Sequence, residues 1–258
     1  MIDFRIAFAV WWRNASLYRR TWKMNILPNF FEPMLYLVGM GVGLGSSVGQ
    51  GMGGVAYIAF IAPGLLMSAA MNGAVFETTY NMFIKMHFNR AYDAYLSTPA
   101  MMQDIVAGEL MWAMTRSGIY GTAFLAVVAG MSFFDYPIIQ SWWALALPFL
   151  ILLVGLMFGL IGSLATSFIK VIDMYSYFFT LFLTPLFLFS GIFFPIDRFP
   201  YGAEIAWCTP LFHAVRASRG FCSGIVGMDV WVSVVWMLAF VAILGIWVPK
   251  RMSKILVD

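Results

Sequence analysis

Long apolar stretches alternate with short polar segments along the chain, at the length and spacing of membrane-crossing helices. Residues 57–80 (YIAFIAPGLLMSAAMNGAVFETTY) are mostly apolar or small. At about 1.5 Å of rise per residue, a stretch of this length crosses a hydrocarbon core of roughly 30 Å. The pattern predicts an all-α polytopic membrane protein with six transmembrane helices in one domain. The expected spans are residues 30–47, 57–80, 105–130, 142–168, 174–194 and 230–248.

Composition supports the membrane class. Apolar residues make up 62% of the 258 residues and charged residues 10%, against roughly 45–50% and 25% in soluble domains. This excess is too large for one globular core. The net charge of +3 is small and dispersed, so no nucleic-acid partner is expected. The first 26 residues lack the apolar core of a secretory signal.

Residues 4–24 combine aromatic and basic side chains at helical spacing. A helix with too many charges to span the bilayer is expected to lie in its interface. An ordinary basic juxtamembrane tail is the alternative. The basic side chains of this predicted interfacial helix are Arg5, Arg13, Arg19, Arg20 and Lys23.

The first span is expected to begin near Pro28 and Pro33, because proline is tolerated in the first turn of a helix. Glu32 would then lie at the positive end of the helix dipole. The distal half is rich in glycine, which allows close approach of another helix. These glycines are Gly39, Gly41, Gly43 and Gly45, and residues 46–54 (SSVGQGMGG) are expected to form a short external turn.

A polar elbow at residues 81–99 joins the second and third spans. About twenty residues are more than a simple turn between two helices requires. We interpret the elbow as a docking surface for a partner protein. Its ionisable side chains are Lys85, His87, Arg90 and Asp93.

The distribution of basic residues predicts that both termini are cytoplasmic, since lysine and arginine are enriched on the inner side of membrane proteins. The predicted inner side holds Arg5, Arg13, Arg19, Arg20, Lys23, Lys85, Arg90, Lys170, Lys250, Arg251 and Lys254, whereas the outer side holds Arg198, Arg216 and Arg219.

Residues 191–220, between the fifth and sixth spans, are too polar to span and too apolar for a plain loop. Pro195, Pro200 and Pro210 divide this segment into short pieces. Short helices that dip into the outer leaflet fit the pattern; a loosely packed external loop is the alternative. Cys208 and Cys222 both fall near this segment, where a disulfide and two free thiols are both compatible with the sequence.

Enzymatic motifs are missing from the sequence. It contains no G-x-x-x-x-G-K-[ST], H-E-x-x-H or G-x-S-x-G pattern, so neither an ATPase site nor a hydrolase site is expected in this chain. His87 and His213 are predicted on opposite sides of the membrane, and no metal site is expected.

Three ionisable residues, Glu77, Glu109 and Arg116, are predicted at membrane depth, where each costs roughly 2.5–3.5 kcal/mol at a helix centre. Glu109 and Arg116 are two turns apart on one helix face, so a contact between them is conceivable though stretched. We favour structural pairing that supports the elbow over a proton relay. Among the many aromatic residues, Tyr57, Tyr175 and Tyr177 are candidates for lining a cargo path.

Four segments carry a family resemblance: residues 57–80, 95–113 (YLSTPAMMQDIVAGELMWA), 181–200 (LFLTPLFLFSGIFFPIDRFP) and 209–220 (TPLFHAVRASRG). In sequence and order they resemble permease subunits of type-2 ABC exporters, and within that family the nodulation-factor exporters, which move lipo-chitooligosaccharides. The resemblance covers essentially the whole chain.

The resemblance implies a homodimer of permease chains in a bacterial inner membrane, with two cytoplasmic ATPase subunits that bind Mg-ATP. No cofactor is implied in this chain. The elbow at 81–99 would be the coupling helix, assisted by the N-terminal helix. The short external helices would cap the pathway, with gate residues Phe194, Pro195, Asp197, Arg198 and His213.

The function implied is ATP-driven export of an amphipathic glycan, a lipid-linked saccharide or a drug-like cargo. An ion-coupled secondary transporter is the alternative. That class needs coupling carboxylates at the midplane and often has inverted repeats, and neither is clear in this sequence. A scaffold protein would transport no cargo.

Overall fold

The structure, a computed structural model, describes residues 2–44, 56–133, 136, 138–196 and 201–255, with the backbone alone at 24–30, 42 and 44. The predicted external turn at 46–54, Gly45, Pro200 and the gate residues Asp197 and Arg198 lie outside the described residues.

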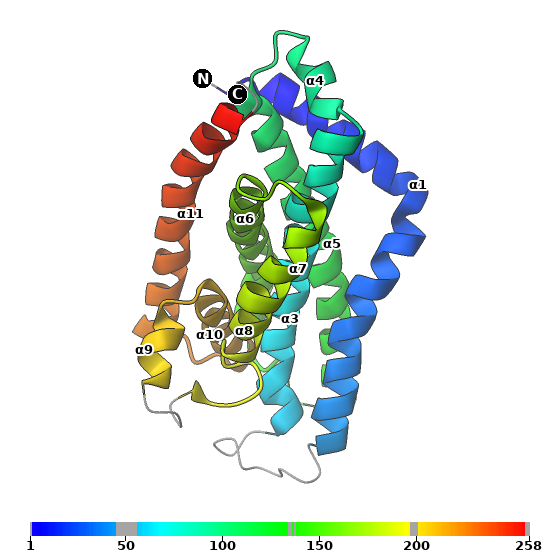
Figure 1. Cartoon of the computed structure of the whole chain (residues 1–258). Coiled ribbons are helices and arrows are strands. Elements are labelled where there is room, and N and C mark those ends of the chain that lie inside the picture. Colours follow the sequence, from blue (N-terminus) through cyan, green and yellow to red (C-terminus); the bar gives the residue numbers. More distant parts are fainter. Residues whose placement is uncertain (1, 45–55, 134–135, 137, 197–200, 256–258) are drawn as a thin grey trace.

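Five long helices form the body of the molecule (Figure 1), and the described residues contain no strand. The all-α prediction is therefore confirmed. Within the described residues, three segments are long and apolar enough to cross a membrane, namely Tyr57–Phe88, Trp142–Thr166 and Met228–Lys254. The count of six spans stays a prediction. The long helices are α1 (Phe4–Tyr36), α3 (Tyr57–Phe76), α5 (Met102–Phe133), α6 (Leu147–Thr166) and α11 (Met228–Ile255).

Shorter elements connect the long helices. Those written η are π-helical or 3₁₀-helical, with wider or tighter turns than an α-helix. The π-helical elements are η1 (Leu37–Leu44), η2 (Glu77–Asn81), η3 (Ile84–Phe88) and η6 (Phe179–Leu183). The 3₁₀ elements are η4 (Trp142–Ala146) and η5 (Ile172–Met174). The short α-helices are α4 (Ala91–Leu96), α7 (Tyr175–Phe178), α8 (Thr184–Leu188), α9 (Gly202–Trp207) and α10 (Pro210–Ser223).

Helices α3, α5 and α6 pack together at the centre of the bundle through glycines. A Cβ atom added at Gly155 would lie 2.6 Å from the Ser117 side chain of α5, and one at Gly162 would clash with the Thr78 side chain. Such close backbone approach is the usual way in which membrane helices associate. The glycines of α6 therefore act as a packing stripe.

Helix α1 differs from the prediction, because one continuous helix replaces the expected interfacial helix and separate first span. Glu32 lies near the end of α1 rather than in a first turn, so the proposed interaction with a helix N-terminus is wrong. Pro33 likewise lies inside the helix. Figure 1 shows a bend between the two halves of α1, as expected where proline removes a backbone hydrogen bond. The interfacial location of the first half stays a prediction.

The polar elbow is shorter than predicted. Helical structure continues from Tyr57 through η2 and η3 to Phe88. The turn between the two long helices therefore begins at Asn89 and contains only α4 and its flanks. Arg90, which precedes α4, has a left-handed backbone with φ 45°. This conformation reverses the chain abruptly, and α4 lies at the end of the bundle where α1 begins and α11 ends (Figure 1).

The segment after α6 is also more broken than predicted. The expected fifth span at 174–194 is helical only to Leu188, as α7, η6 and α8 in succession. Short helices were predicted between the prolines of residues 191–220, and α9 and α10 lie there. Helix α10 packs against α3 and α11, so a loosely packed loop is excluded for the described part of this segment.

Candidate functional site: a buried charge network beneath α4

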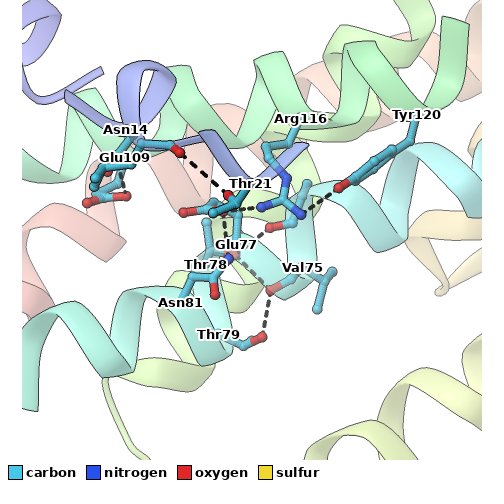
Figure 2. Close-up of polar contacts among 12 residues, drawn as sticks. Asn14, Thr21, Val75, Glu77, Thr78, Thr79, Asn81, Glu109, Arg116 and Tyr120 are labelled. Atoms are coloured by element: carbon cyan, nitrogen blue, oxygen red, sulfur yellow. Dashed lines mark hydrogen bonds and ion pairs between the residues drawn. The ribbon is translucent and has the colours of Figure 1, made fainter. Parts of the chain in front are cut away.

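Four charged side chains meet inside the bundle; Figure 2 labels three of them, Glu77, Glu109 and Arg116. Lys85 Nζ lies 2.8 Å from Glu77 Oε1 and 2.5 Å from Glu109 Oε2. Arg116 Nη1 lies 2.8 Å from Glu77 Oε2. All four side chains are at least nine-tenths buried. We call Glu77, Lys85, Glu109 and Arg116 the charge network.

The π-helical turns explain why Glu77 and Lys85 share a face. Eight residues of α-helix rotate by about 800°, which leaves the second side chain about 80° away from the first. The wider turns of η2 and η3 reduce the rotation per residue. Both side chains therefore point toward α5, where they meet the partners that α5 provides.

The pairing differs from the contact that the sequence suggested. Glu109 and Arg116 lie two turns apart on α5 and form no ion pair with each other in the described part of the chain. Arg116 pairs with Glu77, and Glu109 pairs with Lys85. Glu77, Glu109 and Arg116 were predicted at membrane depth, whereas Lys85 was assigned to the docking surface of the elbow. That assignment is wrong because Lys85 is buried.

Neutral side chains add hydrogen bonds to the network. Asn14 of α1 donates to Glu109 Oε2 at 3.1 Å, and its carbonyl oxygen accepts from Lys85 at 3.3 Å. Asn81 donates to Glu77 at 2.8 Å, and Arg116 donates to the Tyr120 hydroxyl at 2.6 Å. The network thus joins α1, α3 with its π-helical extension, and α5.

The network contains two carboxylates and two cations, so its formal charge is zero. Removing one partner from a buried ion pair typically costs about 3–5 kcal/mol, because the remaining charge is left uncompensated. The three joined helices are therefore expected to move as one unit at this end of the bundle. A cavity of about 300 Å³ opens beside the network and is lined by Asn14, Tyr18 and Arg116, among others.

Helix α4 rests on this network through Tyr92, which is fully buried. Burial, reinforced by the negative charge of Glu109, raises the pKa of Tyr92 well above its ordinary value. Arg13 of α1 lies over the Tyr95 ring of α4, 5.6 Å from its centroid. A force on α4 would therefore reach α1 and α5 directly.

The start of α1 is also tied to the start of α5. Asp104 accepts the backbone N–H of Asp3 at 2.7 Å and that of Met101 at 2.9 Å. Gly108 allows the crossing, since a Cβ atom there would lie 2.5 Å from the Ala7 carbonyl oxygen. The role of Asp104 could not be predicted from the sequence, because its partner Asp3 lies about a hundred residues away in the chain.

The other predicted docking residues are exposed. His87, Arg90 and Asp93 present their side chains to the surface around α4, and they contribute nothing to the buried network. The basic residues of α1 divide similarly. Arg13 is half-buried against α4, whereas the exposed ones are Arg5, Arg19, Arg20 and Lys23.

Three of the predicted external gate residues, Phe194, Pro195 and His213, lie in the described part of the chain. His213 is buried, with one ring nitrogen 2.8 Å from the Trp207 carbonyl and the other 3.2 Å from the Ser233 hydroxyl. Phe194 and Pro195 are half-buried. Their role as a gate stays a prediction.

Arg219 of α10, which was not among the predicted site residues, acts as a clamp: it ties α10 to α3 and to the loop that follows α8. It donates to the carbonyl oxygens of Phe60, Gly191 and Ile192 at 3.0, 2.6 and 3.1 Å. Its guanidinium also lies 3.7 Å from the centroid of the Phe60 ring.

The three cargo-path tyrosines occupy different environments. Tyr57 donates to the Phe193 carbonyl at 3.2 Å, and the Tyr175 hydroxyl lies 2.7 Å from that of Thr166. Both are buried, whereas Tyr177 is exposed. Cys208 and Cys222 are free thiols. The described residues contain no group of three or more His, Cys, Asp or Glu side chains suited to a metal ion.

Comparison with known proteins identifies the family. The family model described as ABC-2 type transporter matches residues 6–221. The chain belongs to the ABC-2 type transporter family. Nodulation protein J of Rhizobium leguminosarum bv. viciae is 38% identical over 214 residues, which cover 82% of this chain and 80% of that protein. Nodulation protein J of Rhizobium meliloti (strain 1021) is 34% identical over 217 residues, covering 84% and 80% of the two chains.

A more distant relative is the inner membrane transport permease YadH of Escherichia coli (strain K12), 27% identical over 223 residues that cover 86% of this chain and 83% of that protein. ABC-2 family members are the membrane subunits of ABC exporters and work with a cytoplasmic ABC ATPase. The chain is therefore a multi-pass membrane protein and an exporter permease subunit.

Proposed function

We propose that two copies of this chain form the transmembrane pathway of an exporter in a bacterial inner membrane, with both termini cytoplasmic. Two separate ATPase subunits bind and hydrolyse Mg-ATP. The cargo is an amphipathic glycan, a lipid-linked saccharide or a drug-like molecule, taken from the cytoplasm or the inner leaflet.

The placement of α4 over the charge network is the observation that supports this proposal. The exposed surface at α4 and just before it, with His87, Arg90 and Asp93, is available to an ATPase. Its buried side, with Tyr92, lies against three helices that are locked together by ion pairs. Movement of the ATPase pair on nucleotide binding would displace α4 and, with it, the ends of α1, α3 and α5.

Co-purification tests the proposal. The tagged permease is extracted gently from membranes of its host, and we expect an ATPase with a Walker motif at one copy per permease chain. Its ATP hydrolysis should be sensitive to vanadate. A purified permease without such a partner would contradict the proposal.

Charge reversal at Arg90, which immediately precedes α4, then tests the docking surface. Arg90→Glu is suitable because both residues carry a Cβ, so the left-handed backbone strain at this position is unchanged. We expect Arg90→Glu to weaken ATPase co-purification and to lower cargo export for each ATP hydrolysed. Glu204→Lys, at an exposed position on α9, is the matched control. Equal export by both variants would refute the docking role. Lys85 is unsuitable for this test, since its reversal would disrupt the buried network.

A further inference from the structure

A polar pocket outside the charge network lies in the flank of the bundle between α1, α3, η6 and α8. It has a volume of about 130 Å³, and its polar lining consists of Glu32, Ser68, Asn72 and Thr184. Ser68 and Asn72 fall in the middle of the apolar segment Tyr57–Phe88. The pocket is therefore far from both polar ends of that segment.

Glu32 is the unusual member of this lining. Its side chain is exposed on the flank of the isolated chain, and it forms no ion pair with any of the described residues. A carboxylate facing lipid near the bilayer centre is costly, because hydrocarbon does not solvate its charge. This face is therefore expected to meet water or a polar group instead of lipid.

A second copy of the chain offers no cation for Glu32 within its predicted spans, apart from Arg116. The lysines and arginines otherwise lie at residues 5–23, 85–90, 170, 198–219 and 250–254, outside those spans or at their ends. Arg116 is buried and already paired with Glu77. A cation that pairs with Glu32 would therefore come from a molecule other than this chain.

The remaining lining of the pocket suits a cation. Phe76, Phe179 and Phe187 contribute aromatic rings, whose faces attract positive charge. Phe76 and Phe179 are stacked with centroids 5.0 Å apart. An ammonium group has three donors and no acceptor, and the pocket offers the carboxylate, an amide oxygen and two hydroxyl oxygens as acceptors.

We propose that this pocket binds the ammonium group of an amphipathic cargo, with Glu32 as its counter-ion. The inference rests on the proposed export function and specifies one chemical class of cargo for it. The π-helical element η6 forms one wall of the pocket, and π-helical turns occur frequently at functional sites.

Photolabelling of the permease alone tests the inference without any ATPase. The protein is placed in phosphatidylcholine nanodiscs, which carry no net charge. It is labelled with a photoreactive dodecylamine or with a photoreactive dodecyl maltoside of identical tail, and the labelled peptides are identified by mass spectrometry. We expect the amine probe to label peptides of α1, α3 and α8 in a saturable manner.

Glu32→Gln keeps the shape of the side chain and removes its charge. We expect this variant to raise the half-saturating concentration of the amine probe about tenfold or more, as for loss of a hydrogen bond to a charged group. Asn72→Leu should also weaken labelling, and Glu204→Gln on α9 should leave it unchanged. Neither Glu32→Gln nor Asn72→Leu adds charge to a predicted span, so folding should be retained.

Unchanged amine labelling in Glu32→Gln would overturn the proposal. Preferential labelling by the maltoside probe, with equal sensitivity to Glu32→Gln, would also overturn it and would indicate a site for hydroxyl-rich groups. Failure to find an ATPase partner would refute the export function but not the labelling result, so the two proposals can fail separately.

Discussion

Replacing Lys85 by methionine removes the cation that contacts two carboxylates of the charge network. Glu77 would keep Arg116 and Asn81 as partners, whereas Glu109 would lose its charged partner and keep the Asn14 amide. The network would carry one uncompensated negative charge. We expect the free energy of unfolding to fall by about 3–5 kcal/mol, the usual cost of breaking a buried ion pair from one side.

The assay is thermal unfolding of the purified permease in nanodiscs. A change of 1 kcal/mol shifts the melting temperature by about 2–4 °C in proteins of 150–250 residues, so Lys85→Met should lower it by about 6–20 °C. Lys170→Met, at an exposed position before η5, is the control and should change little.

The double variant Lys85→Met with Glu109→Gln separates charge balance from packing. It removes one charge of each sign and leaves the Glu77–Arg116 pair intact. We expect it to be more stable than the sum of the two single changes predicts, by a coupling energy of about 0.5–3 kcal/mol. Additive losses, or a loss in Lys85→Met no larger than in Lys170→Met, would refute the reasoning about the network.

Three further predictions concern other parts of the molecule. Gly108→Ala should destabilise the protein by about 1–3 kcal/mol through overpacking, whereas Gly130→Ala, where an added Cβ meets nothing within 4 Å, should be neutral or stabilising in the same melting assay. Arg219→Met should lower stability by about 1.5–3 kcal/mol, because it leaves three carbonyl oxygens without their charged donor; a melting temperature equal to that of the wild type would contradict its role as a clamp. A membrane-impermeant maleimide applied to intact spheroplasts should label Cys208 and not Cys222. Cys208 is exposed, whereas burial raises the pKa of Cys222 to about 12 and keeps its thiol protonated and unreactive at pH 7 to 8. Labelling of Cys208 only after lysis would contradict the proposed orientation.

The sequence predicted the central helices because their apolar length reflects the bilayer directly. The glycines of α6 were also recognisable, since regularly spaced small residues in a span indicate helix contact. The N-terminal helix α1 was less predictable. A change from basic to apolar composition suggested a break after residue 24, but composition does not interrupt backbone hydrogen bonds, and proline bends a long helix without always ending it.

The charge network could be predicted only in part. Glu77, Glu109 and Arg116 stood out because ionisable side chains are rare within spans. Lys85 was assigned to the elbow because the helix was expected to end at Tyr80. Its continuation to Phe88 depends on π-helical turns, which have no recognisable sequence pattern. Asn14 could not have been selected, because its partner Glu109 is distant in the chain.

The position of the charge network limits where the permease can change shape. An ATPase can shift the permease between two conformations only through a difference in its affinity for them. Separating one ion pair of the network would consume about 3–5 kcal/mol of that difference, so displacement of the three joined helices as a unit is favoured.

Relative motion is then expected where helices are short and more exposed. The segment η5–α7–η6–α8 has this character, and it forms one wall of the pocket that contains Glu32. Movement of this wall against α1 and α3 would open or close the pocket, which would connect α4 with cargo binding although the two lie far apart.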